Sequence, residues 1–240
     1  MFVSFLPTVF AILSYMKKIA ILDIDGTLSN SHLGVEFLKE MSALGAIKGV
    51  NQALFTKQYE AWAQSSEKTD YYDRYFDQYY DTRLVGVDKR VFEEAGRRIA
   101  NHAYPHFYTE TLTELKRHQA EGRFIILISK SPEQAVAKIA ELVEAGAHWG
   151  WQFNFDHAGK YVGQYTYPDG ESDKAYIIKQ LVQKHDLDLN DSYAYGDSAG
   201  DISMLHLVSN PVAVNPEPKL LMEAQQNNWR ILRAKPLKNS

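Results

Sequence analysis

Two short acidic loops each carry a pair of carboxylates close together in the sequence. The first loop reads DIDGT at residues 23–27, and the second reads GDSAGD at residues 196–201. Neighbouring carboxylates repel one another and are costly to desolvate unless a cation compensates them. Hard oxygen ligands of this kind suit Mg²⁺. Either loop alone fits an ordinary turn, but two such loops, each directly after an apolar segment, favour a shared divalent-cation site.

A serine and a lysine elsewhere in the chain offer groups that could hold an anion. Ser129 follows a third apolar segment, and Pro132 stands where a helix would begin with free N–H groups. Lys174 lies at the start of a helical pattern, where a cation opposes the helix dipole, and this favours a functional reason for its position. A simple helix cap and a solvated surface lysine are the alternatives when each residue is considered alone.

The elements that must position these groups follow from hydrophobic patterning. Near-continuous apolar segments predict strands that are buried on both faces, and helical patterns alternate with them. This alternation predicts an α/β fold built on a doubly wound parallel sheet, whose ligands bind beyond the carboxyl ends of the strands. The expected strands are Lys18–Leu22, Arg123–Ile128, Ser192–Tyr195 and Pro211–Val214, and the expected helices are Phe107–Gln119, Pro132–Ala145, Lys174–His185 and Ser203–Leu207.

The stretch from residue 33 to residue 105 has helical periodicity and no convincing parallel strand. It separates the first two expected strands by about a hundred residues, far beyond an ordinary crossover connection. We therefore expect an α/β core of residues 1–32 and 106–240, and an inserted helical cap of residues 33–105. The aromatic run YYDRYFDQYY at residues 71–80 favours packing over ligand contact. A β-hairpin is expected between Trp149 and Tyr167.

Composition excludes several classes of protein. The 240 residues are 45% hydrophobic and 23% charged, the mix of a globular protein rather than of a disordered chain or a polytopic membrane protein. The net charge of −4 gives no dense basic face for nucleic acid. Cysteine is absent, which rules out thiolate metal sites and fits a reducing compartment. We expect a cytoplasmic protein that acts on a small molecule, without a nucleic-acid or membrane partner.

The first sixteen residues are strongly apolar and are considered separately. No charge precedes Lys17, Pro7 interrupts the run, and it is shorter than the roughly 20 residues of a spanning helix. A secretory signal peptide is therefore not expected. A translation start at Met16, a peripheral apolar helix and a membrane anchor remain the alternatives, and none of them changes the chemistry of the loops.

Taken in the order Asp-x-Asp, Ser, Lys and Gly-Asp-x-x-x-Asp, the motifs resemble those of the haloacid dehalogenase superfamily of phosphohydrolases. The match covers the core from about Lys18 to Asn215. The segments SKSPEQ, SYAYGDSAGDISML and PVAVNPEP resemble subfamily IB, the phosphoserine-phosphatase-like enzymes, whose helical cap follows the first motif. The resemblance implies a Rossmann-like core and Mg²⁺-dependent hydrolysis of a phosphomonoester through an aspartyl-phosphate.

The resemblance also implies a role for each acidic residue. Asp23 would be the nucleophile, and Asp25 would act as general acid and then as general base. Asp23, Asp197 and the backbone carbonyl of Asp25 would bind Mg²⁺. Asp201 would stand behind them and orient the motif lysine or a metal-bound water.

The remaining motif residues would handle the phosphoryl group and the substrate. By the resemblance, Ser129 and Lys174 would complete the catalytic set and hold the transferring phosphoryl oxygens. We also expect Lys130, Ser131 and His32 to contact the substrate. The inserted cap would exclude water and shape the pocket for the leaving group.

Three departures from the subfamily concern the substrate. Phosphoserine phosphatases usually have Ser where this chain has Gly26, Glu where it has His32, and Asn where it has Gly200. A small phosphomonoester is therefore expected, phosphoserine-like or histidinol-phosphate-like. Cap residues such as His32, Glu36 and Arg74 are the candidates for selecting it.

Two other functions compete with a phosphatase. A phosphotransferase or phosphomutase would form the same aspartyl-phosphate but pass the phosphoryl group to a sugar instead of water. A binding protein on an inactive scaffold would usually lack the nucleophile, and Asp23 is present. Phosphate release or phosphoryl transfer, measured with and without Mg²⁺, separates these functions.

Overall fold

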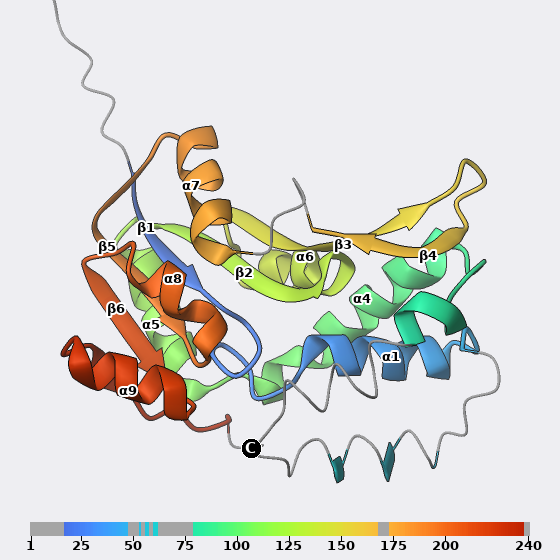
Figure 1. Ribbon diagram of the computed structural model, residues 1–240, viewed down its shortest axis with the longest axis horizontal. Helices are drawn as coiled ribbons and strands as arrows, with labels where there is room; N and C mark the ends of the chain where they lie inside the picture. Colours follow the sequence, from blue (N-terminus) through green and yellow to red (C-terminus); the bar gives the residue numbers. More distant parts are fainter. Residues whose placement is uncertain are drawn as a thin grey trace, which may run out of the picture.

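A seven-stranded sheet in the order β4-β3-β2-β1-β5-β6-β7 forms the centre of the computed structural model (Figure 1). The structure describes residues 17–47, 79–167 and 173–237, together with residues 53, 56–57 and 60–61. All strand pairs are parallel except β3 with β4. The strands are β1 Lys17–Leu22, β2 Phe124–Pro132, β3 Ala147–Phe155, β4 Tyr161–Thr166, β5 Leu187–Gly196, β6 Asn210–Val214 and β7 Arg230–Leu232. The predicted α/β fold class with a doubly wound, mostly parallel sheet is confirmed.

Helices cover both faces of this sheet. α5 and α6 pack on one face, and α7, α8 and α9 pack on the other, with α1 and α4 beside α6. Among the described residues, no helix combines the length and the apolar composition needed to cross a membrane. The helices are α1 Leu33–Ala43, α4 Lys89–Ala103, α5 Thr109–Ala120, α6 Glu133–Leu142, α7 Lys174–Lys184, α8 Ile202–Leu205 and α9 Pro218–Gln226.

Burial on both faces explains why β1 is so apolar. Ala20 and Leu22 belong to the core on the α5 and α6 side, whereas Ile19 and Ile21 belong to the core on the α7 and α8 side. Successive side chains of a strand point to opposite faces, so a strand between two helical layers must be apolar throughout. All four side chains are fully buried, which fixes β1 at the centre of the sheet.

Several elements differ from the sequence-based expectation. β2 runs on through Pro132, which pairs with Trp151 of β3, so Pro132 precedes α6 instead of opening it. β5 begins at Leu187, five residues before the expected start. The expected helix Ser203–Leu207 is a 3₁₀ turn, Ala199–Asp201, followed by the short α8. Helix α9 and strand β7 were not expected.

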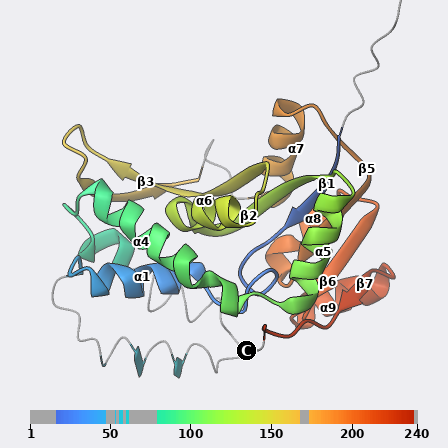
Figure 2. The same ribbon diagram turned by 180° about the vertical axis from the view of Figure 1, so that it is seen from behind.

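The expected hairpin is present and packs against the helices of the inserted segment. β3 pairs antiparallel with β4, and α4 runs alongside α1 and α6 beneath the sheet when the molecule is seen from behind (Figure 2). Phe153 of β3 stacks on Phe37 of α1 at 5.5 Å and meets Phe92 of α4 edge-on at 4.4 Å. The described part of the insertion is therefore joined to the core by aromatic packing.

One member of the tyrosine run has a packing role. Tyr80 is fully buried, its ring meets Trp151 edge-on at 4.9 Å, and its hydroxyl donates to the carbonyl of Gly34 at 2.6 Å. This agrees with packing as the favoured interpretation for that position. Residues 71–78 of the run and residues 1–16 lie outside the described part of the chain.

Candidate active site

Asp23 lies at the carboxyl end of β1 and is 4% exposed. Its N–H donates to the carbonyl of Tyr195 in β5 at 3.0 Å, which ties the first acidic loop to the neighbouring strand. Because parallel strands end at a common edge, Asp23 and the loop after β5 come together there. The first loop is therefore held against the second by sheet pairing.

Lys174 connects the two acidic loops. It opens α7, directly after Asp173, whose side chain caps the helix by accepting from the N–H of Tyr176. Its Nζ lies 2.6 Å from Asp23 Oδ1 and 2.6 Å from Asp201 Oδ1, and the residue is 4% exposed. Burial lowers the pKa of Lys174, but the two carboxylates outweigh burial and raise that pKa. The buried amine therefore stays charged.

Three carboxylates meet beside this lysine. One oxygen from each of Asp23, Asp197 and Asp201 lies within 4.8 Å of the others. Burial and neighbouring carboxylates raise the pKa of Asp23 to about 7, against the opposing effect of Lys174, and they raise the pKa of Asp197 well above its usual range. A divalent cation with oxygen ligands would hold such groups ionised, so this donor set fits Mg²⁺.

Asp201 forms hydrogen bonds within the second acidic loop. Its Oδ2 accepts from the N–H groups of Asp197 and Ser198 and from the Ser198 hydroxyl, at 2.9 to 3.1 Å. Its Oδ1 accepts from Lys174. One carboxylate thus shapes the loop and holds the lysine, as the orienting role expected of Asp201 requires.

Two glycines allow close contacts at the acidic loops, one between the loops and one within the second loop. Gly26 has φ +78°, and a Cβ there would lie 2.1 Å from Asp197 Oδ2. A Cβ at Gly196 would lie 2.4 Å from Asp201 Cβ. A side chain at Gly26 would displace Asp197, and one at Gly196 would displace Asp201, so the geometry of the cluster depends on both glycines.

The Asp25 carboxylate has hydrogen-bond donors of its own. Its Oδ2 accepts from the hydroxyls of Ser129 and Ser131, at 2.8 and 2.7 Å, and its Oδ1 accepts from the N–H of Leu33 at 2.5 Å. The structure therefore brings the expected serines to the second aspartate of the first loop. The three-carboxylate cluster consists of Asp23, Asp197 and Asp201, and the expected contact of the Asp25 carbonyl with the metal stays a prediction.

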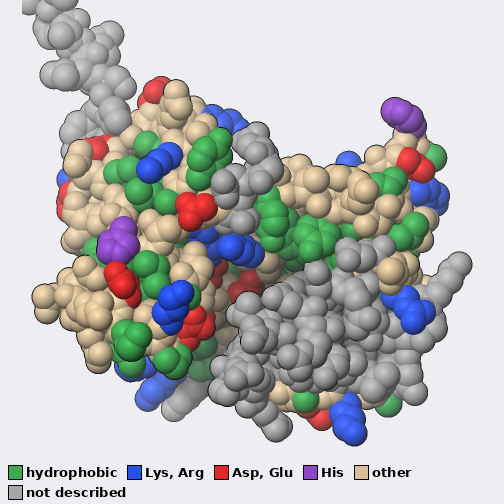
Figure 3. All heavy atoms as spheres, in the orientation of Figure 1, with side chains coloured by type: hydrophobic (Ala, Val, Ile, Leu, Met, Phe, Trp, Pro, Cys, Tyr) green, Lys and Arg blue, Asp and Glu red, His purple; other side chains and the backbone are tan. Residues whose placement is uncertain are grey.

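The other expected substrate residues lie at different places around the site. Lys130 is exposed, His32 is the half-buried residue that precedes α1, and Glu36 pairs with Lys39 at 3.0 Å. Arg74 lies outside the described residues. Figure 3 shows side chains of both charges near the middle of one face, between α8 and the β3–β4 hairpin.

Sequence reasoning missed two residues that support the second acidic loop. Thr27 donates from Oγ1 to Asp197 Oδ1 at 3.1 Å. Glu217 accepts from the N–H of Ala199 at 2.5 Å and donates its own N–H to the carbonyl of Asp197 at 2.9 Å. Both residues stand in the quoted motifs, Thr27 in DIDGT and Glu217 in NPEP, but their partners are distant in sequence.

Fold and site together define an α/β protein with a buried aspartate, a charged lysine and a cluster of three carboxylates at the carboxyl edge of a parallel sheet. The chain belongs to the haloacid dehalogenase-like hydrolase family, whose profile matches residues 20–206. The family expected from the four motifs is therefore confirmed.

Curated relatives carry phosphatase names among others. The chain is 34% identical over 128 residues to the inhibition of morphological differentiation protein of Streptomyces azureus, covering 53% of this chain and 46% of that protein. It is 27% identical over 228 residues to a histidinol-phosphatase of Neisseria meningitidis, covering 92% of this chain and all of that protein. The chain thus spans less than half of the first relative but the whole length of the second.

A solved phosphoserine phosphatase, captured as a phospho-aspartyl intermediate analogue, shares the fold. It superposes with a TM-score of 0.62 at 20% identity and covers 92% of this chain and 95% of its own. At this identity the likeness establishes the fold. The comparisons confirm the resemblance to phosphoserine-phosphatase-like members and agree with the expected enzyme class, a phosphatase.

Proposed function

We propose that this chain is a Mg²⁺-dependent phosphomonoester hydrolase that acts through an aspartyl-phosphate on Asp23. The observation that carries the proposal is the buried carboxylate of Asp23, with Lys174 Nζ at 2.6 Å and the carboxylates of Asp197 and Asp201 beside it. A carboxylate and a phosphate dianion repel each other, so a lysine and a metal cation must neutralise the approaching phosphoryl group. This site supplies the lysine, and its three carboxylates suit the cation.

The chemistry divides into two half-reactions. First, Asp23 attacks phosphorus as the bond to the leaving alkoxide breaks, and Asp25 gives its proton to that alkoxide. Asp25 then takes a proton from water, whose oxygen attacks phosphorus and releases Asp23. Ser129 and Lys174 hold the phosphoryl oxygens throughout. When bound by Asp23, Asp197 and the Asp25 carbonyl, Mg²⁺ would supply further positive charge to the phosphoryl group.

The proposed substrate is a small phosphorylated metabolite, such as phosphoserine or histidinol phosphate. The full-length alignment with a histidinol-phosphatase supports this size of substrate. The proposed cap of residues 33–105 would select the substrate. Its first residue, Leu33, donates its N–H to Asp25, so the cap begins beside the proposed proton donor. A cytoplasmic location completes the proposal, and the absence of cysteine is compatible with it.

A phosphate-release assay tests this function. The wild-type chain is offered histidinol phosphate, phosphoserine, β-glycerol phosphate and p-nitrophenyl phosphate, with Mg²⁺ and after chelation. We expect release that depends on Mg²⁺, and at least a hundredfold loss in Asp23→Asn because the covalent route is gone, on the order of the losses seen for catalytic groups.

The matched control is Asp191→Asn, which changes an exposed carboxylate that pairs with Lys18 at the far end of β1. It should keep near-wild-type activity, and circular dichroism should show both variants folded. Asp23→Asn activity above a few per cent of wild type would exclude the aspartyl-phosphate route. Transfer of phosphate to an added alcohol in preference to water would favour the phosphotransferase.

A further inference from the structure

The Asp25 carboxylate is hydrogen-bonded at both of its oxygens. The N–H of Leu33 reaches Oδ1 from the first turn of α1, and the hydroxyls of Ser129 and Ser131 reach Oδ2 from the end of β2. Two separate elements thus set the direction in which this carboxylate points. The direction matters because the proposed function, on which this inference rests, gives Asp25 both proton transfers.

Ser131 is buried at the end of β2. It is 1% exposed and lies on the same side of the chain as Ser129, since both hydroxyls donate to the same oxygen of Asp25. Lys130 between them is exposed. Gly150 of β3 gives the Ser131 backbone room, because a Cβ there would lie 2.8 Å from the Ser131 carbonyl oxygen. The buried hydroxyl of Ser131 is therefore placed at Asp25 by a strand segment that β3 approaches closely.

The two serines cannot keep the same partner once a phosphoryl group is bound. A hydroxyl carries one proton and can donate only one such hydrogen bond at a time. In the proposed reaction, Ser129 donates to a phosphoryl oxygen, so its bond to Asp25 must break. Asp25 then keeps only the N–H of Leu33 and the hydroxyl of Ser131 among the donors described.

We propose that Ser131 is a positioning residue for Asp25, and that it holds the carboxyl group in line with the reacting oxygen while Ser129 serves the phosphoryl group. A hydroxyl suits this task because it can donate to a carboxylate and accept from a carboxylic acid by rotating. Its own proton is not consumed. The transferred proton passes from Asp25 to the leaving oxygen in the first half-reaction, and Asp25 regains one from water in the second.

A positioning role and a substrate-contact role for Ser131 predict different effects on two kinds of ester. The ratio kcat/KM reports the steps up to release of the leaving group. An alkyl ester such as β-glycerol phosphate needs its leaving oxygen protonated, whereas p-nitrophenolate leaves without a proton. Misdirecting Asp25 should therefore slow the alkyl ester more than the nitrophenyl ester. Losing a phosphoryl contact, or destabilising the fold, would slow both alike.

The experiment compares Ser131→Ala with wild type on both esters in saturating Mg²⁺. We expect kcat/KM for β-glycerol phosphate to fall at least about tenfold, and kcat/KM for p-nitrophenyl phosphate to fall less than about threefold, because only general-acid catalysis is impaired. Inhibition by inorganic phosphate should stay near the wild-type level. Ser192→Ala is the matched control, since Ser192 is also a buried serine, and its hydroxyl bonds the backbone of Ile19 and Asp188 instead of an acidic loop.

The pair Ser131→Thr and Ser131→Val provides a second measurement if the alanine variant does not fold. The two replacements have nearly the same shape, but only threonine keeps a hydroxyl, so threonine should restore the wild-type ratio between the two esters and valine should not. Equal losses on both esters, or equal behaviour of threonine and valine, would overturn the positioning role and leave the proposed function intact. A wild-type chain that hydrolyses neither ester with Mg²⁺ would overturn both.

Discussion

At the scale of the residue, the site is a set of charges that compensate one another across sequence motifs. Lys174 would be unfavourable in a buried place without Asp23 and Asp201, and these carboxylates would be unfavourable without Lys174. Breaking a buried pair by removing one partner leaves a charge without compensation, which costs about 3–5 kcal/mol. The first acidic loop, Lys174 and the second acidic loop therefore stabilise one another in the folded chain.

The first prediction concerns the candidate metal ligand Asp197. Asp197→Asn keeps an oxygen beside Thr27 but removes a negative charge from the cluster, so the affinity for Mg²⁺ should fall. We expect the Mg²⁺ concentration for half-maximal phosphate release to rise at least about tenfold. Thermal melts give a second readout, because Mg²⁺ should raise the melting temperature of the wild type more than that of the variant. An unchanged Mg²⁺ dependence would remove Asp197 from the ligand set.

The second prediction separates backbone strain from close approach at Gly26. Gly26→Ala forces a left-handed conformation on alanine and places a Cβ against Asp197. Activity should therefore fall at least about a hundredfold, the loss expected when a catalytic group is misplaced. Gly122→Ala is the matched control. Gly122 has φ +72°, but a Cβ there would meet nothing within 4 Å, so only the strain of about 1–2 kcal/mol applies.

Both variants should therefore lose stability, and only Gly26→Ala should lose phosphatase activity. Melting temperatures and kcat/KM for p-nitrophenyl phosphate, measured on both proteins, provide the comparison. Full activity in Gly26→Ala would show that the two acidic loops need not touch for catalysis. Equal activity losses in the two variants would assign the effect to strain alone.

At the scale of the element, strands could be predicted where both faces are buried. β1 has the same limits as the expected Lys18–Leu22 to within one residue, because every side chain from Ile19 to Leu22 enters a core. The same pattern located the starts of β2 and β6 to within one residue. The acidic loops and the serine could then be placed at the carboxyl edge, because parallel strands end together.

What the sequence could not predict depends on contacts between distant segments. The chain remains extended at Pro132 because that residue pairs with Trp151, and local pattern gives no sign of this partner. β7 is an edge strand of three residues with little burial, so it lacks an apolar run. The partners of Thr27 and Glu217 in the second acidic loop come from elsewhere in the chain and become visible only once the sheet is assembled.

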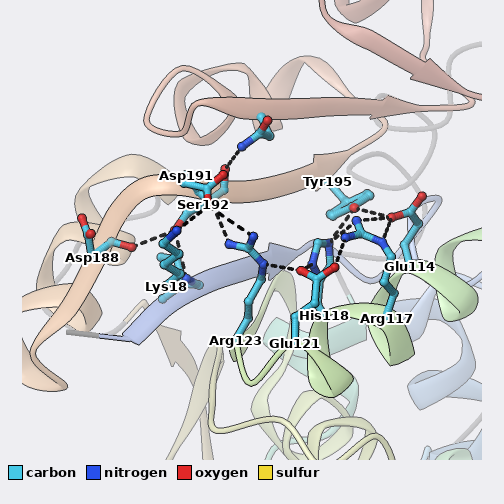
Figure 4. A network of polar contacts seen from close by, with 12 residues as sticks. Lys18, Glu114, Arg117, His118, Glu121, Arg123, Asp188, Asp191, Ser192 and Tyr195 are labelled. Carbon is cyan, nitrogen blue, oxygen red and sulfur yellow. Dashed lines mark hydrogen bonds and ion pairs between the residues drawn. The ribbon is translucent and has the colours of Figure 1, made fainter. Parts of the chain in front are cut away.

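Helix α5 is joined to the sheet by a polar network (Figure 4). His118 is fully buried, and its Nε2 lies 2.8 Å from the hydroxyl of Tyr195, which donates to Glu114 at 3.1 Å. Arg117 and Arg123 lie over the neighbouring aromatic residue of β5, Tyr193, at 5.2 and 4.9 Å from the centre of its ring. Because β5 leads directly into the second acidic loop, this network helps to support the site from behind.

The third prediction is an acid sensitivity that originates at His118. Burial, followed by the positive charges of Arg117 and Arg123, lowers the pKa of His118 to about 4, while Glu114 and Glu121 oppose this shift. Between that value and the ordinary pKa of about 6.5, the unfolded chain binds a proton that the folded chain does not. The neutral imidazole therefore contributes fully to the free energy of unfolding at pH 7, and this contribution declines as the pH falls below about 6.5. At pH 5 the free energy of unfolding should be lower by about 2 kcal/mol than at pH 7.

Thermal melts at pH 7 and pH 5 check this prediction. The drop in melting temperature on acidification should be smaller in His118→Gln than in wild type by about 4–8 °C, the shift that corresponds to 2 kcal/mol in a chain of this size. His102→Gln, at an exposed position on α4, is the matched control and should follow wild type. The same acid sensitivity in all three proteins would show that other groups cause it.

At the scale of the whole molecule, the catalytic edge and the insertion are parts of one packed structure. One hydrophobic core extends from β1 through α1 and α4 to the β3–β4 hairpin. α1 follows the first acidic loop directly, and its first N–H bonds Asp25. A change in the position of α1 would therefore displace Asp25, the proposed proton donor.

The last prediction places specificity in the inserted segment. The motif residues at the sheet edge would contact only the phosphoryl group and the metal, which all phosphomonoesters share, so discrimination must come from groups near the leaving group. Glu36 in the first turn of α1 is the described candidate for testing, and Glu36→Gln should change kcat/KM by different factors for histidinol phosphate, phosphoserine and β-glycerol phosphate. Glu93→Gln removes another lysine-paired glutamate, in the N-terminal half of α4, and should leave the order of the three substrates unchanged. If Glu36→Gln and His32→Ala also preserve that order, neither residue selects the leaving group.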